Sequence, residues 1–480
     1  MYDVIIIGAG ITGAAAAFEL SKYRLDTVVL ERENDIACGT TKANSAILHA
    51  GYDPEPGSLM ARLNVRGVAL ARELCAKLDV PYRPCGSFVL GFTEADDATL
   101  AQLLAKGRAN GVPGLELLTG DAARALEPGL SPAVTAALHA PSAAIVSPWE
   151  YALALLETAV ANGVSLFRDA EVTALGHIPG GWQVETAAGT FQGRYVLNAA
   201  GVHADAVHDL AAPHAFIIHP ARGQYHLLDK DQGGKVGRVI FQCPNEHGKG
   251  VLVAPTVHGN LIVGPNSEPV QGDDTATTAA GLACVRETAL KSVPSIDFRA
   301  DIRTFAGVRA VADTGDFVIG EAQGAPGFFD LAGICSPGLS AAPAIAEYAV
   351  ELLGAKGLPL IPREDHRCVR SRIRFHGLSP EAKARLTALR PDYGRIICRC
   401  ETVTEGEILD ALRAPIPPVS VDGVKRRVNA GMGRCQGGFC SPRVVELLCR
   451  ELGLDPLDVV QDRAGSRLLD SETKGGGDRV

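Results

Sequence analysis

The chain has 480 residues, of which 46% are hydrophobic and 53 are glycine, and its formal net charge is −9. This acidic balance gives no support for nucleic-acid binding, and the length exceeds one ordinary core, so two or three domains are expected. The longest apolar stretches are strand-sized or interrupted, and Tyr2 and Asp3 lead directly into the first of them. These features predict a cytoplasmic protein without a transmembrane span or a signal peptide.

The first predicted elements form a dinucleotide-binding unit. Val4–Ile7 is expected to be a buried parallel strand, because the run is short, β-branched and continuously apolar. Gly8 then allows a tight turn, Gly10 lets the backbone approach a pyrophosphate, and Gly13 lets a helix pack closely on the strand. Glu31 ends the second apolar run, about where a ribose-binding carboxylate is expected. FAD and NAD share this motif, so the motif alone leaves the nucleotide open.

Two later segments indicate FAD. Residues 194–205 (RYVLNAAGVHAD) and residues 330–342 (DLAGICSPGLSAA) each run from an apolar strand into a glycine-containing turn. Together with the first motif, and in this order, they resemble the D-amino-acid-oxidase-like flavoproteins. The resemblance implies an α/β fold with a Rossmann-type FAD-binding domain and an antiparallel-sheet substrate cap. It further implies that FAD is contacted by Gly8, Gly10, Gly13, Glu31, Arg32, Thr41, Ser45, Val172, Ala200, Gly201, Gly333, Gly338 and Leu339.

The FAD part is predicted to be discontinuous, because its signatures lie near both ends of one long span. Between them, alternating strands such as GQYHLLD, GKGVLVAPT and NLIVGP are expected in the cap. The predicted boundaries are 1–354 for the flavin part with its cap at roughly 80–140 and 215–310, 355–394 for a linker, 395–463 for a small helical C-terminal domain and 464–480 for a flexible tail.

A candidate catalytic base lies in residues 43–56, ANSAILHAGYDPEP. This segment resembles the flavin-facing segment shared by FAD-dependent glycerol-3-phosphate dehydrogenases and oxidases and by L-2-hydroxyglutarate dehydrogenases. The resemblance implies that His49 removes the alcohol proton while hydride passes to the flavin. Imidazole suits that task because its pKa is near neutral without tuning. The alternative is a core histidine whose hydrogen bonds are satisfied.

The expected substrate is anionic, and FAGVRA (305–310) resembles the family segment that carries an arginine into the active site. Arg309 is therefore the candidate anion ligand, since a guanidinium matches carboxylate or phosphate in two-point contact. A salt bridge elsewhere in the fold is the alternative. Arg222, Gln224 and Tyr225 are weaker candidates from PARGQYHLL, and Cys335 stands where relatives often carry a longer polar residue.

Four of the twelve cysteines form a set near the C-terminus: Cys398 and Cys400, then Cys435 and Cys440. Two close pairs can converge on a soft metal site, and the glycines around the second pair let amides approach sulfur. The region resembles the [2Fe-2S] domain of bacterioferritin-associated ferredoxins, although that family more often has two residues between the second pair. Structural zinc is the alternative. A redox flavin in the same chain gives a cluster an evident use, which favours [2Fe-2S].

The whole chain resembles the catalytic subunit of anaerobic-type glycerol-3-phosphate dehydrogenases. The resemblance implies oxidation of a small anionic secondary alcohol, with hydride to flavin and electrons onward through the cluster to an acceptor protein or quinone-linked subunit. Such a partner would place the protein peripherally at the inner membrane. Three alternatives remain: a 2-hydroxy acid such as L-2-hydroxyglutarate, an amine or opine, and an electron-transfer module without a substrate of its own.

Overall fold

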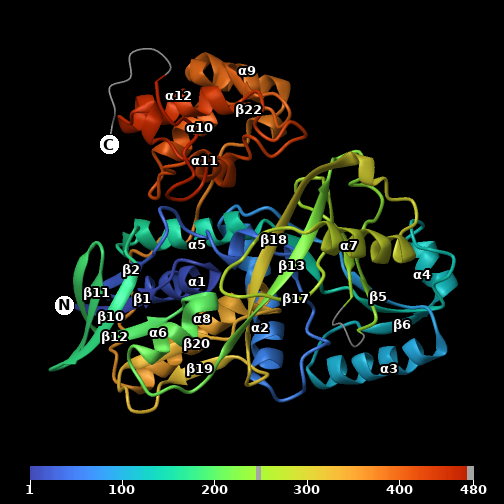
Figure 1. The fold of residues 1–480 in the computed structure, drawn as a ribbon, viewed down its shortest axis with the longest axis horizontal. Helices are drawn as coiled ribbons and strands as arrows, with labels where there is room; N and C mark the ends of the chain where they lie inside the picture. The colour runs from blue at the N-terminus through green and yellow to red at the C-terminus, as the bar shows by residue number, and fades with distance from the viewer. Residues whose placement is uncertain (245–249, 473–480) are drawn as a thin grey trace. The chain divides into compact units, whose positions relative to one another are not determined.

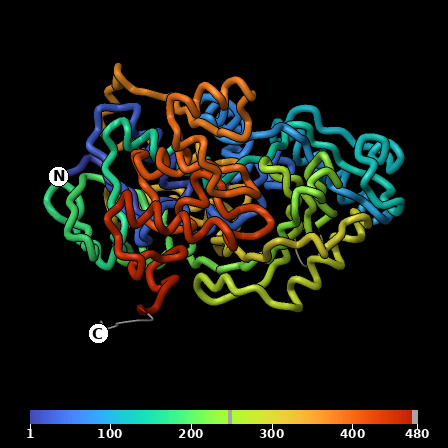
Figure 2. Tube along the Cα trace, turned by 90° about the horizontal axis from the view of Figure 1, so that it is seen from above, coloured from blue at the N-terminus to red at the C-terminus, as the bar shows by residue number. Residues whose placement is uncertain are grey.

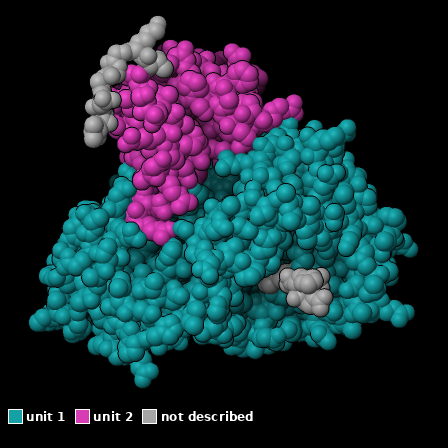
Figure 3. All heavy atoms as spheres, in the orientation of Figure 1, with its two compact units in different colours: residues 1–30, 37–370 teal, residues 31–36, 371–480 magenta. Residues whose placement is uncertain are grey.

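The computed structural model describes residues 1–244 and 250–472. These fall into two compact units, residues 1–30 with 37–370 and residues 31–36 with 371–480, which Figure 3 colours separately. Residues 248–249 of one predicted cap strand and residues 473–480 of the predicted tail lie outside the described residues.

The nucleotide-binding sheet of the first unit is built on five parallel strands in the order β9, β2, β1, β12, β20. The antiparallel strands β10, β11 and β19 extend it (Figure 1). Their bounds are β1 Tyr2–Ile7, β2 Thr27–Leu30, β9 Ser165–Phe167, β10 Val172–Ile178, β11 Gly181–Thr186, β12 Gly189–Asn198, β19 Val318–Glu321 and β20 Phe328–Ala332. The last four residues of β1 are fully apolar and buried, as expected of a strand with helices on both faces.

The helices of this part pack on one another around α1, which contacts both α5 and α8. The alanines of α1 are buried and leave room for close packing. The helices are α1 Ile11–Leu20, α2 Leu59–Lys77, α5 Pro148–Ala161, α6 Ala204–Asp209 and α8 Gly338–Ala355. A separate three-stranded sheet is formed by β3 Ile47–Leu48, β8 Ala144–Val146 and β4 Tyr82–Pro84. Its strand β3 belongs to the segment that follows the nucleotide motif in the chain.

A second sheet, of nine strands in the described residues, forms the cap. Its strands are β5 Ser87–Gly91, β6 Glu116–Thr119, β7 Ala136–Ala140, β13 Ile218–Leu228, β14 Val239–Gln242, β15 Leu252–Pro255, β16 Leu261–Gly264, β17 Glu268–Pro269 and β18 Asp301–Ala312, with helices α3 Glu94–Ala109, α4 Gly120–Leu126 and α7 Ala279–Ser292. The pairing is antiparallel as predicted, except that β5 and β14 run parallel. That pair joins the two separate stretches of chain that build the cap, so its direction was not encoded by any hairpin turn.

The C-terminal unit is small and mainly helical, and the trace in Figure 2 runs from orange to red through it. It holds α9 Pro380–Leu389, β21 Ile396–Cys398, β22 Val403–Thr404, α10 Glu405–Leu412, α11 Val421–Val428 and α12 Ser441–Leu452. Thr404 and Glu407 form a capping box at the start of α10, and the apolar faces of α10, α11 and α12 share one buried cluster. Helix α9 lies within the stretch predicted as a linker.

Among the residues that the structure describes, no helix has the length and apolar character needed to cross a membrane.

Candidate active site and cluster-binding loop

The glycine turn after β1 is shaped by close backbone contacts. Gly8 has a φ of +100°, and a Cβ there would lie 2.6 Å from the carbonyl oxygen of Ala199, at the turn after β12. A Cβ on Gly13 would lie 1.9 Å from the carbonyl oxygen of Gly8. Only glycine fits either position. The structure thus brings the first and second predicted flavin segments together at one edge of the sheet.

The amino terminus of α1 fits a pyrophosphate. Its N-cap, Gly10, provides no side-chain cap, and the first turn carries no acidic residue. The amide of Ile11 donates to Thr41 Oγ1 over 3.0 Å, which fixes the segment after β2 against this turn. Amides and the helix dipole at such a terminus favour a phosphate charge.

The other predicted nucleotide contacts fall at the ends of strands. Glu31 directly follows β2, is 8% exposed and accepts a hydrogen bond from the backbone of Glu33. Arg32 pairs with Glu33 at 3.3 Å. Val172 begins β10, packed against the sheet core, and Gly201, next to Ala200, has a φ of +61°. The contact of these residues with FAD stays a prediction.

A second uncapped helix terminus lies where the flavin ring is predicted. Gly333 has a φ of +64° directly after β20, and Gly338 begins α8, followed by half-buried Leu339. Pro337, the N-cap, gives α8 no side-chain cap. A Cβ on Gly338 would lie 2.6 Å from Ile334, so the loop needs glycine here. The amides of Gly338 and Ser340 donate to the carbonyl oxygens of Cys335 and Pro337. The positive end of the helix dipole at this terminus suits the electron-rich pyrimidine edge of a reduced flavin.

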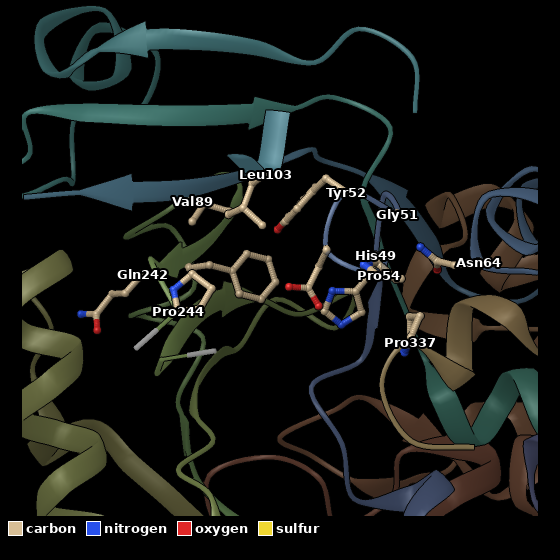
Figure 4. A pocket seen from close by; sticks show the side chains of 12 residues that line it. His49, Gly51, Tyr52, Pro54, Asn64, Val89, Leu103, Gln242, Pro244 and Pro337 are labelled. Carbon is tan, nitrogen blue, oxygen red and sulfur yellow. The ribbon is translucent and has the colours of Figure 1, made fainter. Parts of the chain in front are cut away.

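The predicted base lines a pocket beside this loop. His49 donates its backbone amide to Ser340 Oγ over 2.7 Å, and its Nε2 lies 3.4 Å from Ser336 Oγ. The imidazole lies against the ring of Phe241, with centroids 5.6 Å apart. Pro337 lines the same pocket. His49 therefore faces a partly apolar cavity between the flavin loop and the cap (Figure 4).

Sequence reasoning missed three polar and aromatic residues of this pocket: Asn64, Phe241 and Gln242. Asn64 lies on α2, is fully buried, and neither carboxamide atom has a hydrogen-bond partner in the described residues. A buried amide without partners is costly, so it is a candidate ligand contact. No local signal marked Asn64, because α2 has an ordinary amphipathic pattern. In Figure 4 Asn64 and Gln242 lie on opposite sides of the view.

Arg309 is not among the pocket-lining residues. It lies half-buried on β18 and donates to the carbonyl oxygens of Ala221, over 3.4 Å, and Asn266, over 3.1 Å. Within the described ranges it has no carboxylate partner. Strand β18 approaches the flavin-side segment closely, since a Cβ on Gly307 would lie 1.8 Å from the carbonyl oxygen of Ala43.

The weaker candidates for substrate contact, all on β13, have different hydrogen-bond and ion-pair partners from those of Arg309. Arg222 is 8% exposed and forms ion pairs of 2.8 Å with both Glu268 and Asp274. Gln224 is fully buried and also donates to Glu268. These two side chains hold the cap together. The hydroxyl of Tyr225, also on β13, instead lies 3.1 Å from the hydroxyl of Ser45, which is outside the cap sheet.

The four C-terminal cysteines meet as two pairs. Cys398 and Cys440, both buried, share a side-chain hydrogen bond, and the sulfurs of Cys400 and Cys435 lie 3.5 Å apart. In the described part of the chain, no three metal-ligating side chains gather as a site for one ion. Two thiol pairs match the ligand set of a binuclear cluster, in which each iron takes two cysteines.

The loop around these thiols stabilises negative sulfur. The hydrogen bond from Cys440 lowers the pKa of the Cys398 thiol to about 6, and the backbone amides of Gly431 and Glu401 add to this against the effect of burial. A Cβ on Gly433 would lie 2.4 Å from Cys400 Cβ. The glycines predicted to let amides approach sulfur therefore do so at Gly431, and Gly433 makes room for a ligand.

Comparison with known proteins agrees with both sites. Residues 3–352 match the family described as FAD dependent oxidoreductase, and residues 396–450 match the BFD-like [2Fe-2S] binding domain. A glycerol 3-phosphate dehydrogenase of Caloramator mitchellensis is 46% identical over 477 residues, covering 99% of both chains. An L-2-hydroxyglutarate dehydrogenase of Salmonella houtenae is 32% identical over 273 residues, 56% of this chain and 64% of that protein.

A solved structure shows the same fold. The dithionite-reduced L-alpha-glycerophosphate oxidase of Mycoplasma pneumoniae, with FAD bound, superposes with a TM-score of 0.72 at 30% identity, covering 77% of this chain and 98% of that one. The predictions of an FAD-binding oxidoreductase fold and of a C-terminal [2Fe-2S] domain are confirmed. The chain belongs to the glycerol 3-phosphate dehydrogenase family of FAD dependent oxidoreductases and carries a BFD-like [2Fe-2S] binding domain at its C-terminal end.

Proposed function

We propose that this oxidoreductase converts sn-glycerol 3-phosphate to dihydroxyacetone phosphate in the pocket beside His49. The observation that supports this most directly is the imidazole in a cavity next to the uncapped terminus of α8. Bound FAD supplies a hydride acceptor, and the cluster supplies a one-electron carrier. Oxidation of a secondary alcohol removes a hydride from carbon and a proton from oxygen, so the chain must supply a base.

His49 is proposed as that base. Its contact from Nε2 to Ser336 Oγ is at the long limit for a hydrogen bond, at 3.4 Å, so a substrate hydroxyl can replace it. The ring of Phe241 and the ring of Pro337 line the same cavity and exclude water from the proton transfer. Water exclusion strengthens the interaction between the imidazole and the hydroxyl.

Arg309 is proposed as the ligand of the anionic end. Its guanidinium is hydrogen-bonded only to carbonyl oxygens among the described residues, so its positive charge is not neutralised by a carboxylate. Arg222, by contrast, is balanced by two acidic side chains. A phosphate or carboxylate at Arg309 would gain two charge-assisted hydrogen bonds.

Electrons leave through the C-terminal unit in this proposal, to an acceptor protein or a quinone-linked subunit in the cytoplasm or at the inner membrane. The cluster supports an onward acceptor other than oxygen, because a simple oxidase needs no relay. The second candidate substrate is L-2-hydroxyglutarate, because a carboxylate suits Arg309 equally well and a dehydrogenase of that acid is 32% identical over part of the chain.

Anaerobic flavin bleaching tests the proposal. The purified protein is titrated in parallel with sn-glycerol 3-phosphate and L-2-hydroxyglutarate, and the flavin absorbance is followed. Rapid bleaching by the phosphate alone is expected. Bleaching by the hydroxy acid alone would support the same oxidation chemistry but identify the hydroxy acid as the substrate. The proposal is overturned if neither compound bleaches the flavin and bleaching is seen with amines or opines, or only with NADH or a partner protein.

A further inference from the structure

Residues 31–36, which begin with the predicted ribose-binding carboxylate of Glu31, belong to a different compact unit from the glycine turn of the nucleotide motif. Strand β2 ends at Leu30, and residues 31–36 are counted with the C-terminal unit. Glu31 is the first residue of this segment, and Asp35 lies four positions further on. The contacts of Asp35 and its neighbours explain the grouping.

Asp35 is fully buried and bound by two arginines of α11. Arg427 donates to both carboxylate oxygens over 2.8 Å, and Arg426 donates to Oδ2 over 2.9 Å. The side chains of Arg426 and Arg427 are 5% and 1% exposed. Arg426 also pairs with Asp462 at 2.7 Å. The two-point contact fixes both the position and the orientation of the Asp35 carboxylate.

The rest of the segment is held by the same unit. Asn34 donates its Nδ2 to the carbonyl oxygen of Asp462 over 2.9 Å, and Glu33 lies 3.8 Å from Arg463. Helix α11 is shaped to admit the segment: a Cβ on Gly423 would lie 3.1 Å from Asp35 Oδ2. The path of the backbone from Glu31 to Asp35 is therefore set by residues that lie almost four hundred positions away.

Helix α11 also contacts the cluster loop. Lys425, the residue before the two arginines, donates to Gln436 Oε1 over 3.2 Å, and Gln436 follows the cluster ligand Cys435. The helix ends at Asn429, with a φ of +62°, two residues before Gly431, whose amide binds the sulfur of Cys398. Three consecutive basic residues thus contact the cluster loop and the ribose segment from one short helix.

We propose that α11 couples the two cofactor sites. The Asp35 ion pairs act as positioning contacts that hold Glu31 for the ribose of FAD, while Lys425 and the end of the helix hold the loop of the cluster ligands. Each cofactor then favours the arrangement of α11 that the other needs. By linkage, cluster occupancy raises the affinity for FAD, and FAD raises the affinity for the cluster by the same factor. We expect the second effect to appear as slower loss of iron. This inference rests on the two cofactor sites and not on the identity of the substrate.

The first test measures FAD affinity without turnover. Full-length protein is stripped of FAD with its cluster retained, and FAD is titrated back while the change in flavin fluorescence is followed. Asp35→Asn is expected to raise the Kd for FAD about tenfold, within the 5–150-fold range of typical coupling energies. The matched control is Asp410→Asn on α10, because Asp410 pairs with Arg390 in the same unit and belongs neither to residues 31–36 nor to α11. The control is expected to bind FAD as the unaltered protein does.

The second test measures the reverse effect. Iron loss to a chelator is timed with and without saturating FAD. FAD is expected to slow iron loss in the unaltered protein and in Asp410→Asn, and to have no effect on it in Asp35→Asn. A purely structural role for Asp35 would speed iron loss in the variant but leave the slowing by FAD intact, and that result would overturn the proposal. Equal FAD affinity in the two Asn variants would overturn it too.

Asp35→Asn removes the carboxylate that the buried Arg427 binds, so Arg427→Lys is the second variant. Lysine keeps the buried positive charge and loses the two-point contact. If Asp35→Asn fails to fold, the same two measurements on Arg427→Lys decide the question. Weaker FAD binding together with a smaller FAD effect on iron loss supports the coupling, and unchanged values of both contradict it.

Discussion

The hydroxyl of Tyr225 lies 3.1 Å from the hydroxyl of Ser45, which joins cap strand β13 to the segment on the flavin side of the pocket. The ring of Tyr225 is stacked on Phe305, with centroids 4.8 Å apart and the ring planes 7° from parallel. Burial raises the pKa of this phenol, against the charge of Arg309 and the Ser45 hydrogen bond, so the group stays neutral near physiological pH. The cap is therefore attached here by one neutral hydrogen bond, while the aromatic stack lies within the cap sheet, because Tyr225 and Phe305 are paired across β13 and β18.

Tyr225→Phe should remove the hydrogen bond and keep the stack. The expected loss in the free energy of unfolding is about 0.5–1.5 kcal/mol, the usual net value of one neutral hydrogen bond. Denaturant unfolding of the FAD-bound protein measures it. Ser45→Ala should cost about the same, and the double variant should cost no more than either alone. Additive losses would show that the two hydroxyls do not depend on each other.

His49→Ala should keep FAD bound and slow its reduction by substrate. Removal of a general base typically costs about 10²–10⁴-fold in rate. Stopped-flow bleaching under anaerobic conditions gives the rate constant, and the flavin spectrum confirms that the cofactor is retained. His219→Ala is the matched control, because His219 is an exposed histidine on β13. An unchanged reduction rate in His49→Ala would remove His49 from the role of base.

Cys435→Ser should abolish the absorbance of the cluster and, at saturating FAD, leave bleaching of the bound flavin by substrate intact. The reason is that Cys435 belongs to one of the two thiol pairs, whereas the flavin site is built from other residues. Cys449→Ser on α12 is the control, since Cys449 lies outside the set of four. Metal analysis of anaerobically prepared protein completes the test. Zinc in place of iron would make the C-terminal domain structural.

Asn64→Leu should stabilise the FAD-free protein and impair turnover. Both polar atoms of this buried carboxamide lack partners in the described ranges, and an unsatisfied buried polar group costs about 1–3 kcal/mol. We expect a higher unfolding midpoint together with a lower kcat/KM. Asn44→Leu is the contrast, because the Asn44 side chain bonds to Thr40, Thr41 and Ala46. That variant should lose stability. A destabilised Asn64→Leu protein would show that Asn64 is satisfied in solution.

The cap sheet should lose stability as the pH rises above neutrality. Burial opposes the charged form of His226, but the hydrogen bond to Asp301 at 2.5 Å, the carbonyl of Leu282 and the Asp301 charge outweigh it and raise the pKa of His226 above its ordinary 6.5. A raised folded-state pKa gives stability that is fully present below the unfolded pKa and lost as pH rises through the folded one. Thermal unfolding near pH 6 and near pH 9 should therefore differ more in the unaltered protein than in His226→Gln.

The sequence by itself determined the local units. The strand, glycine turn and helix at residues 2–20 followed from apolar continuity and from the steric need of Gly13, which involves its near neighbour Gly8, whereas the close contact of Gly8 with Ala199 is a tertiary one. The capping box at Thr404 is likewise local. The four cysteines could be predicted as cluster ligands because two close thiol pairs suit a soft metal site, and their role as ligands stays a prediction. The roles of Arg309 and His49 stay predictions, carried by a resemblance in short segments.

Only the tertiary structure decided which distant groups satisfy one another. Asp35 and Arg427 are 392 positions apart, and nothing near either residue indicates that they form a buried ion pair. Among the residues that the structure describes, Arg222 is neutralised within the cap while Arg309 pairs with no carboxylate, and the Asn64 carboxamide has no partner beside His49. The physical reason is that periodicity and turn chemistry record interactions between neighbours in the chain. Charge pairing, burial and pocket lining depend on which surfaces meet when the elements pack.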